Sequence, residues 1–303
     1  MIKVLITKIN NHVRNPLKIP LKILRKINYL LKLKNYNFNF YKNKQNDIFH
    51  SCGLNRDEGI QNLNKIKKKI DLNANTNREM SSEHEIMLSS ISIKKNIKIE
   101  NILEIGTYDG FNALLLSYLF PNAKVSTIDL PEDDKDFIAS YKRKNQLVEF
   151  IENRKKNISL GNNIRFMPMN SIKLINHKIK YDLIWVDGAH GYPIVSIDII
   201  NAMNLINDNG IIACDDILLD ISHEESDKIY NSIAAYETLS ELKKQKLIDF
   251  KLIYKRLNAE NNCVSYRRKF VSIINNVKKS WIKFVFLKNY LNLNIKSINK
   301  VGA

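Results

Sequence analysis

Residues 101–129 constrain the fold of this 303-residue chain more than any other stretch. They predict a strand over Ile102–Ile105, a turn bounded by Gly106 and Gly110, a helix, and a second strand ending on Asp129. Glycine tolerates positive φ and has no Cβ, and this turn leads into a helix N-terminus that favours an anionic ligand group. A carboxylate after the next strand is placed to accept hydrogen bonds from a ribose diol. The stretch therefore predicts nucleotide binding at the carboxyl edge of a parallel sheet.

Strand and helix patterns alternate through the rest of the chain. Helices are predicted over Asp136–Asn157, Ile194–Ile206 and Glu224–Lys246. Further strands are predicted over Asn163–Met169, Tyr181–Asp187 and Gly210–Asp216, with a closing antiparallel pair over Phe250–Leu257 and Asn262–Arg268. This alternation is typical of an α/β fold with a doubly wound, mostly parallel, seven-stranded sheet.

The positive charge lies mainly at the two ends of the chain. The formal net charge is +17, yet residues 1–46 carry 11 Lys and Arg with no acid, and residues 267–303 carry nine with no acid. The remainder has 28 basic and 31 acidic residues. We therefore expect a basic N-terminal extension and linker or cap over 1–80, with a helix near 60–70, a central domain over 81–269, and a basic tail over 270–303. A slightly acidic central domain argues against nucleic acid as the partner.

The N-terminal extension contains one amphipathic segment, Pro20–Lys32, with Ile and Leu on one face and Lys and Arg on the other. Two interpretations stay open: a helix on an anionic membrane surface, or a helix docked on its own domain or on a second subunit, as in a homo-oligomer. No apolar run has the length of a signal-peptide core or a membrane span. Three scattered cysteines, Cys52, Cys214 and Cys263, indicate free thiols in a reducing compartment. We expect a cytoplasmic protein, with contact at the inner face of the membrane under the first interpretation.

A capping box over Ser82–Glu85 predicts the helix that precedes the first strand, with His84 facing solvent.

A second group of polar residues follows two of the predicted strands. Asp187 and His190 come after one, and Asp215 and Asp216 end the next. Because parallel strands end at the same edge of a sheet, these side chains should converge near the glycine turn. The functional interpretation is an oxygen-rich divalent metal site with His190 as general base. The alternative is that Asp187 and Asp216 cap helices and His190 is only hydrogen-bonded.

The motifs of both groups have a family resemblance. Glu104-Ile-Gly106-Thr-Tyr-Asp-Gly110 resembles E-x-G-x-x-x-G, the first motif of class I S-adenosylmethionine-dependent methyltransferases. Leu183-Ile-Trp-Val-Asp187-Gly-Ala-His190 and Gly210-Ile-Ile-Ala-Cys-Asp215-Asp216 resemble the branch with catechol O-methyltransferase-like and macrolide-sugar O-methyltransferases. The resemblance covers roughly residues 82–268. It implies a Rossmann-like methyltransferase sheet and methyl transfer to a hydroxyl oxygen of a sugar, glycan or small metabolite.

The resemblance also implies roles for particular residues. S-adenosylmethionine would be bound by Glu104, Gly106, Thr107, Tyr108, Gly110, Asp129, Leu130, Asn170, Ser171 and Asp187. Mg²⁺ would be held by Asp187, Asp215 and Asp216, with His190 and Asp187 as the catalytic pair.

Two positions depart from the family pattern. Asp215 stands where metal-dependent relatives carry Glu, and metal-independent relatives also have an Asp pair here. Asn170 stands where the family usually has Asp, and its carbonyl oxygen can accept the same hydrogen bond. A metal-independent small-molecule methyltransferase is therefore the first alternative, and a nucleic-acid methyltransferase or binding protein the second.

Overall fold

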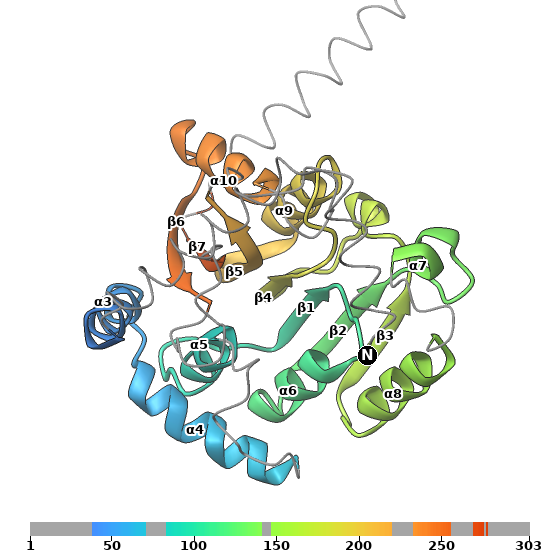
Figure 1. Cartoon of the computed structure of the whole chain (residues 1–303), viewed down its shortest axis with the longest axis horizontal. Helices are drawn as coiled ribbons and strands as arrows, with labels where there is room; N and C mark the ends of the chain where they lie inside the picture. Colours follow the sequence, from blue (N-terminus) through green and yellow to red (C-terminus); the bar gives the residue numbers. More distant parts are fainter. Residues whose placement is uncertain are drawn as a thin grey trace, which may run out of the picture.

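The computed structural model describes residues 38–70, 83–140, 147–219, 233–255, 269–275 and 277. At its centre lies a seven-stranded sheet in the order β3-β2-β1-β4-β5-β7-β6 (Figure 1). The strands are β1 (Asn101–Ile105), β2 (Lys124–Asp129), β3 (Ile164–Pro168), β4 (Tyr181–Val186), β5 (Ile206–Leu218), β6 (Asp249–Tyr254) and β7 (Lys269–Asn275). Strands β1 to β5 pair in parallel, whereas β7 is antiparallel to both β5 and β6. The predicted α/β fold with a mostly parallel seven-stranded sheet is confirmed.

Helices cover both faces of the sheet (Figure 1). They are α3 (Phe38–Ser51), α4 (Arg56–Lys69), α5 (Glu83–Ser92), α6 (Phe111–Leu119), α7 (Lys135–Ser140), α8 (Leu147–Ser159), the 3₁₀ helix η1 (Ser171–Asn176), α9 (Ile194–Leu205) and α10 (Ala234–Lys244). One core cluster joins the sheet to α3 through α6, and the other joins it to η1, α9 and α10. Strand β4 lies between them, and its Leu183, Ile184 and Trp185 are fully buried. Its nearly unbroken apolar sequence therefore matches a central strand covered on both faces.

The described helices α3 and α4 pack against the central domain. The Asn55 side chain caps α4 by accepting hydrogen bonds from the backbone N–H groups of Asp57 (3.1 Å) and Glu58 (3.2 Å). Leu63 and Ile66 of α4 join the buried cluster that also contains apolar residues of α5. The helix expected near residues 60–70 is thus present and begins earlier, at Arg56.

Three predicted boundaries differ from the structure. The single helix predicted over Asp136–Asn157 is described as two helices, α7 and α8, with residues 141–146 outside the description. Strand β5 begins at Ile206 rather than Gly210, because a register shift against β4 accommodates the residues predicted as a turn. The strand paired with β6 lies at Lys269–Asn275, whereas the predicted Asn262–Arg268 lies outside the described residues. The sheet therefore continues into the stretch predicted as the basic tail.

Several predicted features fall outside the described residues. These are the amphipathic segment Pro20–Lys32, Ser82 of the capping box, residues 220–232, and most of the tail after 275. Within the part of the chain that is described, no helix is both long and apolar enough to cross a membrane.

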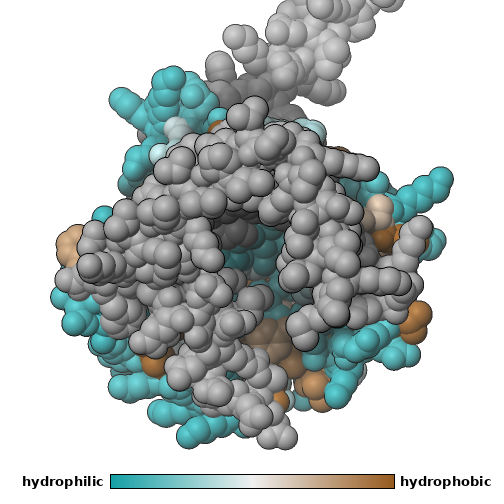
Figure 2. Space-filling view, in the orientation of Figure 1, coloured by the Kyte–Doolittle hydropathy of each residue, from teal (hydrophilic) through white to brown (hydrophobic). Residues whose placement is uncertain are grey.

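The described surface in the view of Figure 2 is largely hydrophilic at its margin, with isolated hydrophobic residues. Exposed large apolar side chains belong to different elements, such as Phe40 in α3, Val148 in α8 and Ile175 in η1. Singly exposed apolar residues of this kind are normal on a protein surface.

Candidate functional site

The turn between β1 and α6 depends on its two glycines. Gly106 has φ +101° and Gly110 has φ +76°. A Cβ on Gly106 would lie 2.2 Å from the backbone oxygen of Asp187, which follows β4. Gly106 is therefore required for the close approach of two strand ends as well as for the turn itself. This contact joins the glycine turn to the second group of predicted site residues.

Asp129 at the end of β2 fixes the other side of the turn. Its Oδ2 accepts a hydrogen bond from the backbone N–H of Tyr108 (3.0 Å), and its Oδ1 accepts one from that of Leu130 (2.8 Å). Arg154 of α8, which the sequence did not single out, places Nη1 3.9 Å from Oδ2 of Asp129. The guanidinium is 4.9 Å from each of the Phe137 and Phe166 ring centres. The predicted ribose acceptor thus lies beside the buried guanidinium group of Arg154.

Glu104 is buried beneath the turn. Its carboxylate accepts hydrogen bonds from Nδ2 of Asn112 (2.7 Å) and from the Thr127 hydroxyl, which is 2.6 Å from the Thr107 hydroxyl. Burial raises the pKa of Glu104 to about 8. Glu104 and Thr107 therefore stabilise the conformation of the turn through buried hydrogen bonds. Tyr108, in contrast, is 43% exposed at its surface.

Asn170 and Ser171 lie after β3, as predicted. The Asn170 side-chain oxygen accepts a hydrogen bond from the backbone N–H of Ile172 (3.0 Å) and so caps η1. The backbone oxygen of Ser171 accepts one from Nδ2 of Asn201 in α9 (3.2 Å). The carbonyl of Asn170 has a second lone pair for a further donor.

The predicted catalytic pair, Asp187 and His190, follows β4 and lies beside Asp216 of β5. His190 is 7% exposed, and its Nε2 is 3.6 Å from Oδ1 of Asp187 and 3.8 Å from Oδ2 of Asp216. The backbone N–H of Asp187 donates to the Ile105 oxygen (2.8 Å), which ties the group to β1. Burial, and then the neighbouring Asp215 carboxylate, raise the pKa of Asp187 well above its ordinary value. The structure thus brings together the acids and the histidine that the sequence placed at one edge.

Lys255, immediately after β6, is a member of this group that sequence reasoning missed. Its Nζ lies 2.5 Å from Oδ2 of Asp215 and 2.5 Å from Oδ1 of Asp216. The three side chains are 12%, 3% and 13% exposed. The pKa of Lys255 is raised because the attraction of the surrounding carboxylates outweighs the cost of burial.

A β-bulge allows both acids to contact the same ammonium. Successive side chains of a regular strand point to opposite faces. The pairing of β5 with β7 is irregular between Cys214 and Ile217, and Asp216 has φ +52°. One extra residue on β5 therefore turns both consecutive carboxylates toward Lys255.

The donor set does not fit the predicted Mg²⁺. A divalent ion needs deprotonated oxygen ligands in near-octahedral geometry, but Lys255 already occupies the space between Asp215 and Asp216. Among the described residues, no group of three or more His, Cys, Asp or Glu side chains is arranged to hold a metal ion.

His84 differs from the expectation that it faces solvent. Its ring stacks on buried Trp185 of β4, with ring centres 5.1 Å apart, and burial lowers its pKa. The capping pattern predicted the helix but could not show that its first turn points at the sheet. His84 thus lies at the part of the sheet edge that carries Asp215, and the charges of Asp215 and Lys255 act on its pKa.

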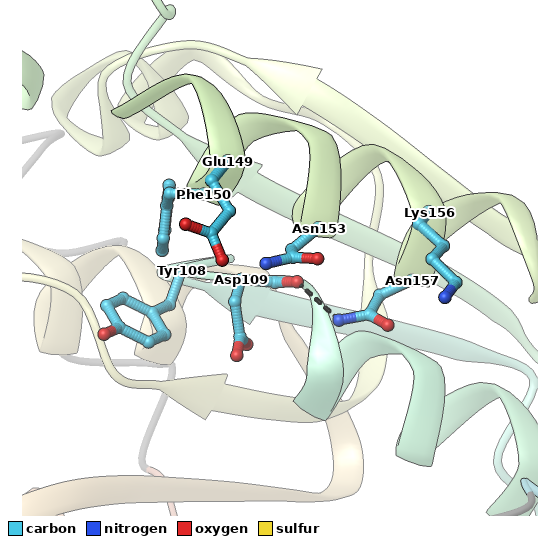
Figure 3. A pocket seen from close by; sticks show the side chains of 7 residues that line it. All are labelled: Tyr108, Asp109, Glu149, Phe150, Asn153, Lys156 and Asn157. Atoms are coloured by element: carbon cyan, nitrogen blue, oxygen red, sulfur yellow. Dashed lines mark hydrogen bonds between the residues drawn. The ribbon is translucent and has the colours of Figure 1, made fainter. Parts of the chain in front are cut away.

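A polar pocket of about 300 Å³ lies between the glycine turn and α8 (Figure 3). Tyr108 and Asp109 line it from the turn, and Nδ2 of Asn157 in α8 donates to the Asp109 backbone oxygen (2.8 Å). Tyr108 meets Phe150 of α8 edge to face, with ring centres 5.0 Å apart. The pocket borders the turn from outside and is not lined by Asp187 or His190.

Comparison with known proteins adds a family match. Residues 103–217, from β1 into β5, match a family model described as a methyltransferase domain. No curated protein matches the chain.

Three solved structures show a distant likeness. One is the O-methyltransferase TomG from Streptomyces achromogenes in complex with SAM (13% identity, TM-score 0.46, 76% of this chain and 94% of that chain). The second is an O-methyltransferase from Bacillus cereus in complex with SAH (12%, 0.46, 73% and 90%). The third is the N-methyltransferase NodS from Bradyrhizobium japonicum WM9 (13%, 0.45, 67% and 99%). Likeness of this degree does not transfer a substrate or a cofactor to this chain.

Proposed function

We propose that the chain transfers a methyl group from S-adenosylmethionine to a hydroxyl oxygen, and the match of residues 103–217 to a family model described as a methyltransferase domain supports this proposal. The acceptor we propose is a sugar, a glycan or another small metabolite. The observation that carries the proposal is the packing of the Asp187 backbone against Gly106, which brings the glycine turn and the His190 group to one edge.

The residues around the turn fit the cofactor. Positive φ at Gly106, Tyr108 and Gly110 shapes a backbone concavity at the N-terminus of α6, where a carboxylate would be favoured. Asp129 offers carboxylate lone pairs beyond those used by Tyr108 and Leu130. Asn170 lies after the next strand in the sheet order, where an adenine amino group would be accepted. When bound, S-adenosylmethionine supplies a methyl group on a positively charged sulfur.

His190 is the proposed general base. Nε2 lies 3.8 Å from Oδ2 of Asp216, so a proton accepted there from the substrate hydroxyl is stabilised by that carboxylate. The low exposure of His190 keeps water from competing for that proton. Alignment of the hydroxyl and the methyl donor accounts for most of the remaining rate enhancement.

Calorimetric titration with S-adenosylmethionine and S-adenosylhomocysteine tests the cofactor. Asp129→Ala should weaken binding by roughly tenfold to a hundredfold, because hydrogen bonds to a charged group contribute about 1.5–3 kcal/mol. Asp133→Ala removes an exposed carboxylate four residues later and is the matched control. Wild-type protein that binds neither compound would refute the proposal.

Methyl transfer from labelled cofactor to a panel of hydroxylated sugars and phenols tests the base. On an accepted substrate, His190→Ala should reduce turnover by about 10²–10⁴ while cofactor affinity stays within twofold or so. Equal loss of cofactor affinity would instead assign His190 a structural role.

A further inference from the structure

We infer that Lys255 takes the place of a divalent cation in this site, so that the protein acts without a metal on acceptors that need not chelate one. The inference rests on the proposed methyl transfer. It follows from where the ammonium lies and from what holds it there.

The ammonium lies between the carboxylates that would be metal ligands. It contacts Asp215 and Asp216 at 2.5 Å each, and Asp187 is a further source of its electrostatic stabilisation. Like-charged carboxylates gathered at one edge are unfavourable without a compensating cation. Lys255 supplies that cation from the chain itself. A dication entering the same space would have to displace it and leave a buried ammonium unpaired.

A buried polar network fixes the chain segment that carries Lys255. The Lys255 backbone oxygen accepts a hydrogen bond from the backbone N–H of Glu83 (2.9 Å), the first residue of α5. Arg56 of α4 binds the Glu83 carboxylate through two hydrogen bonds of 2.7 Å. Gln45 of α3 binds both the N–H and the oxygen of Tyr254 at 3.0 Å, and its Nε2 lies 3.3 Å from Glu83.

This network of buried hydrogen bonds holds the end of β6 in place beside the site. Gln45, Arg56, Glu83 and Tyr254 are each at most 8% exposed. Three helices that precede β1 in the chain, α3 to α5, therefore position one side chain at the carboxyl edge of the sheet. The backbone of an ordinary surface lysine is not held by a buried hydrogen-bond network of this kind.

The replacement changes which acceptors are suited to the site. A divalent ion binds two neighbouring oxygens of a diol and orients them together. An ammonium donates hydrogen bonds and offers no coordination positions. The acceptor is thus expected to need one reactive hydroxyl, held near His190, rather than a vicinal pair.

Cation binding to the full-length protein tests the inference without an identified acceptor. Mn²⁺ is titrated into wild type, Lys255→Met and Lys251→Met, and bound Mn²⁺ is measured by electron paramagnetic resonance. Lys251 is the matched control because it lies within β6, close to Lys255 in sequence, but donates to the Ser51 backbone oxygen (2.9 Å) outside the site. Wild type and Lys251→Met should bind no stoichiometric Mn²⁺ at concentrations up to about 1 mM, which is the dissociation constant of a weak cation site. Lys255→Met should bind about one ion per chain, and adding Asp216→Asn should abolish that binding.

Two results would overturn the inference: stoichiometric Mn²⁺ binding by wild type that Asp216→Asn removes, or a folded Lys255→Met that gains no ion. If Lys255→Met does not fold, the wild-type and Asp216→Asn titrations remain decisive. Cofactor titration of the same wild-type sample separates the two proposals. Absent S-adenosylmethionine binding would refute the proposed function, whereas the Mn²⁺ result bears only on Lys255.

Discussion

Two halves of the carboxyl edge hold their acids in different ways. On the glycine-turn side, Asp129 is bound by the N–H groups of Tyr108 and Leu130, one of them its direct neighbour in sequence. On the acid side, Asp215 and Asp216 both accept hydrogen bonds from Lys255, which is 40 and 39 residues away. Backbone N–H groups of the turn and of the next residue, with Arg154 beside them, thus hold the acid of the first half, whereas the side chain of Lys255 holds those of the second. The first half can therefore be recognised as a sequence motif, whereas the second forms only when the folded sheet brings distant residues together.

The acid side should be the more fragile half, because its support is a buried ion pair. Glu83→Ala leaves the Arg56 guanidinium unpaired with a side chain only 7% exposed, and we expect a loss of about 3–5 kcal/mol in the free energy of unfolding. Urea unfolding measures it. Glu100→Ala, which breaks the exposed pair with Lys98, should leave the free energy of unfolding almost unchanged, because ion pairs between solvent-exposed side chains contribute little. Similar small losses for both variants would show that this network does not hold the end of β6.

Gly106 is the contact between the two halves. In Gly106→Ala the new Cβ lies 2.2 Å from the Asp187 oxygen on a residue with φ +101°, so backbone strain and overpacking should cost about 2–4 kcal/mol. Unfolding in urea gives the loss, and calorimetry should show weaker cofactor binding. Gly191→Ala is the control, since nothing lies within 4 Å of its added Cβ. A tolerated Gly106→Ala would mean that the two halves are not rigidly joined.

The glycine-turn side should carry a pH dependence through Glu104. Its pKa in the folded protein is about 8, above the roughly 4.3 of an unfolded chain, so the folded state keeps a proton that the unfolded state releases. The stability from this group is full below about pH 4.3 and is lost as the pH rises through about 8. Its contribution falls by about 1.4 kcal/mol per pH unit between those values. Urea unfolding across this range should show the slope in wild type and a reduced slope in Glu104→Gln; equal slopes would contradict the assignment.

The smallest expected effect is at the hydroxyl pair beneath the turn. Thr107→Val removes the 2.6 Å hydrogen bond to Thr127 and should cost about 0.5–1.5 kcal/mol. Ser196→Ala breaks a similar pair with Thr238 (2.8 Å) between α9 and α10 and should cost about the same. Only Thr107→Val should also weaken cofactor binding by calorimetry. Unchanged affinity in both variants would limit Thr107 to a structural role.

Local sequence determined the elements and one half of the edge. Alternating strands and helices predicted the sheet, and the spacing of Gly106, Gly110 and Asp129 predicted the turn, because these features depend on neighbours within about thirty residues. The convergence of Asp187, His190 and Asp216 followed from a general property of parallel sheets. The early start of β5 at Ile206 was not predictable from the same patterns.

The identity of the cation beside the acids depends on tertiary contacts. Strand β7 is antiparallel to both β5 and β6, so β6 runs parallel to β5 and ends at the same edge, two strand spacings or about 10 Å away. The bulge at Asp216 turns two consecutive carboxylates toward that end, and the long Lys255 side chain spans the remaining distance. No local sequence pattern around Lys255 predicts this contact. It depends on the position of β7 between β5 and β6 and on helices α3 to α5, which hold the end of β6. The sequence therefore indicated a cation between the acids, while the packing of distant segments determined that the cation is a lysine.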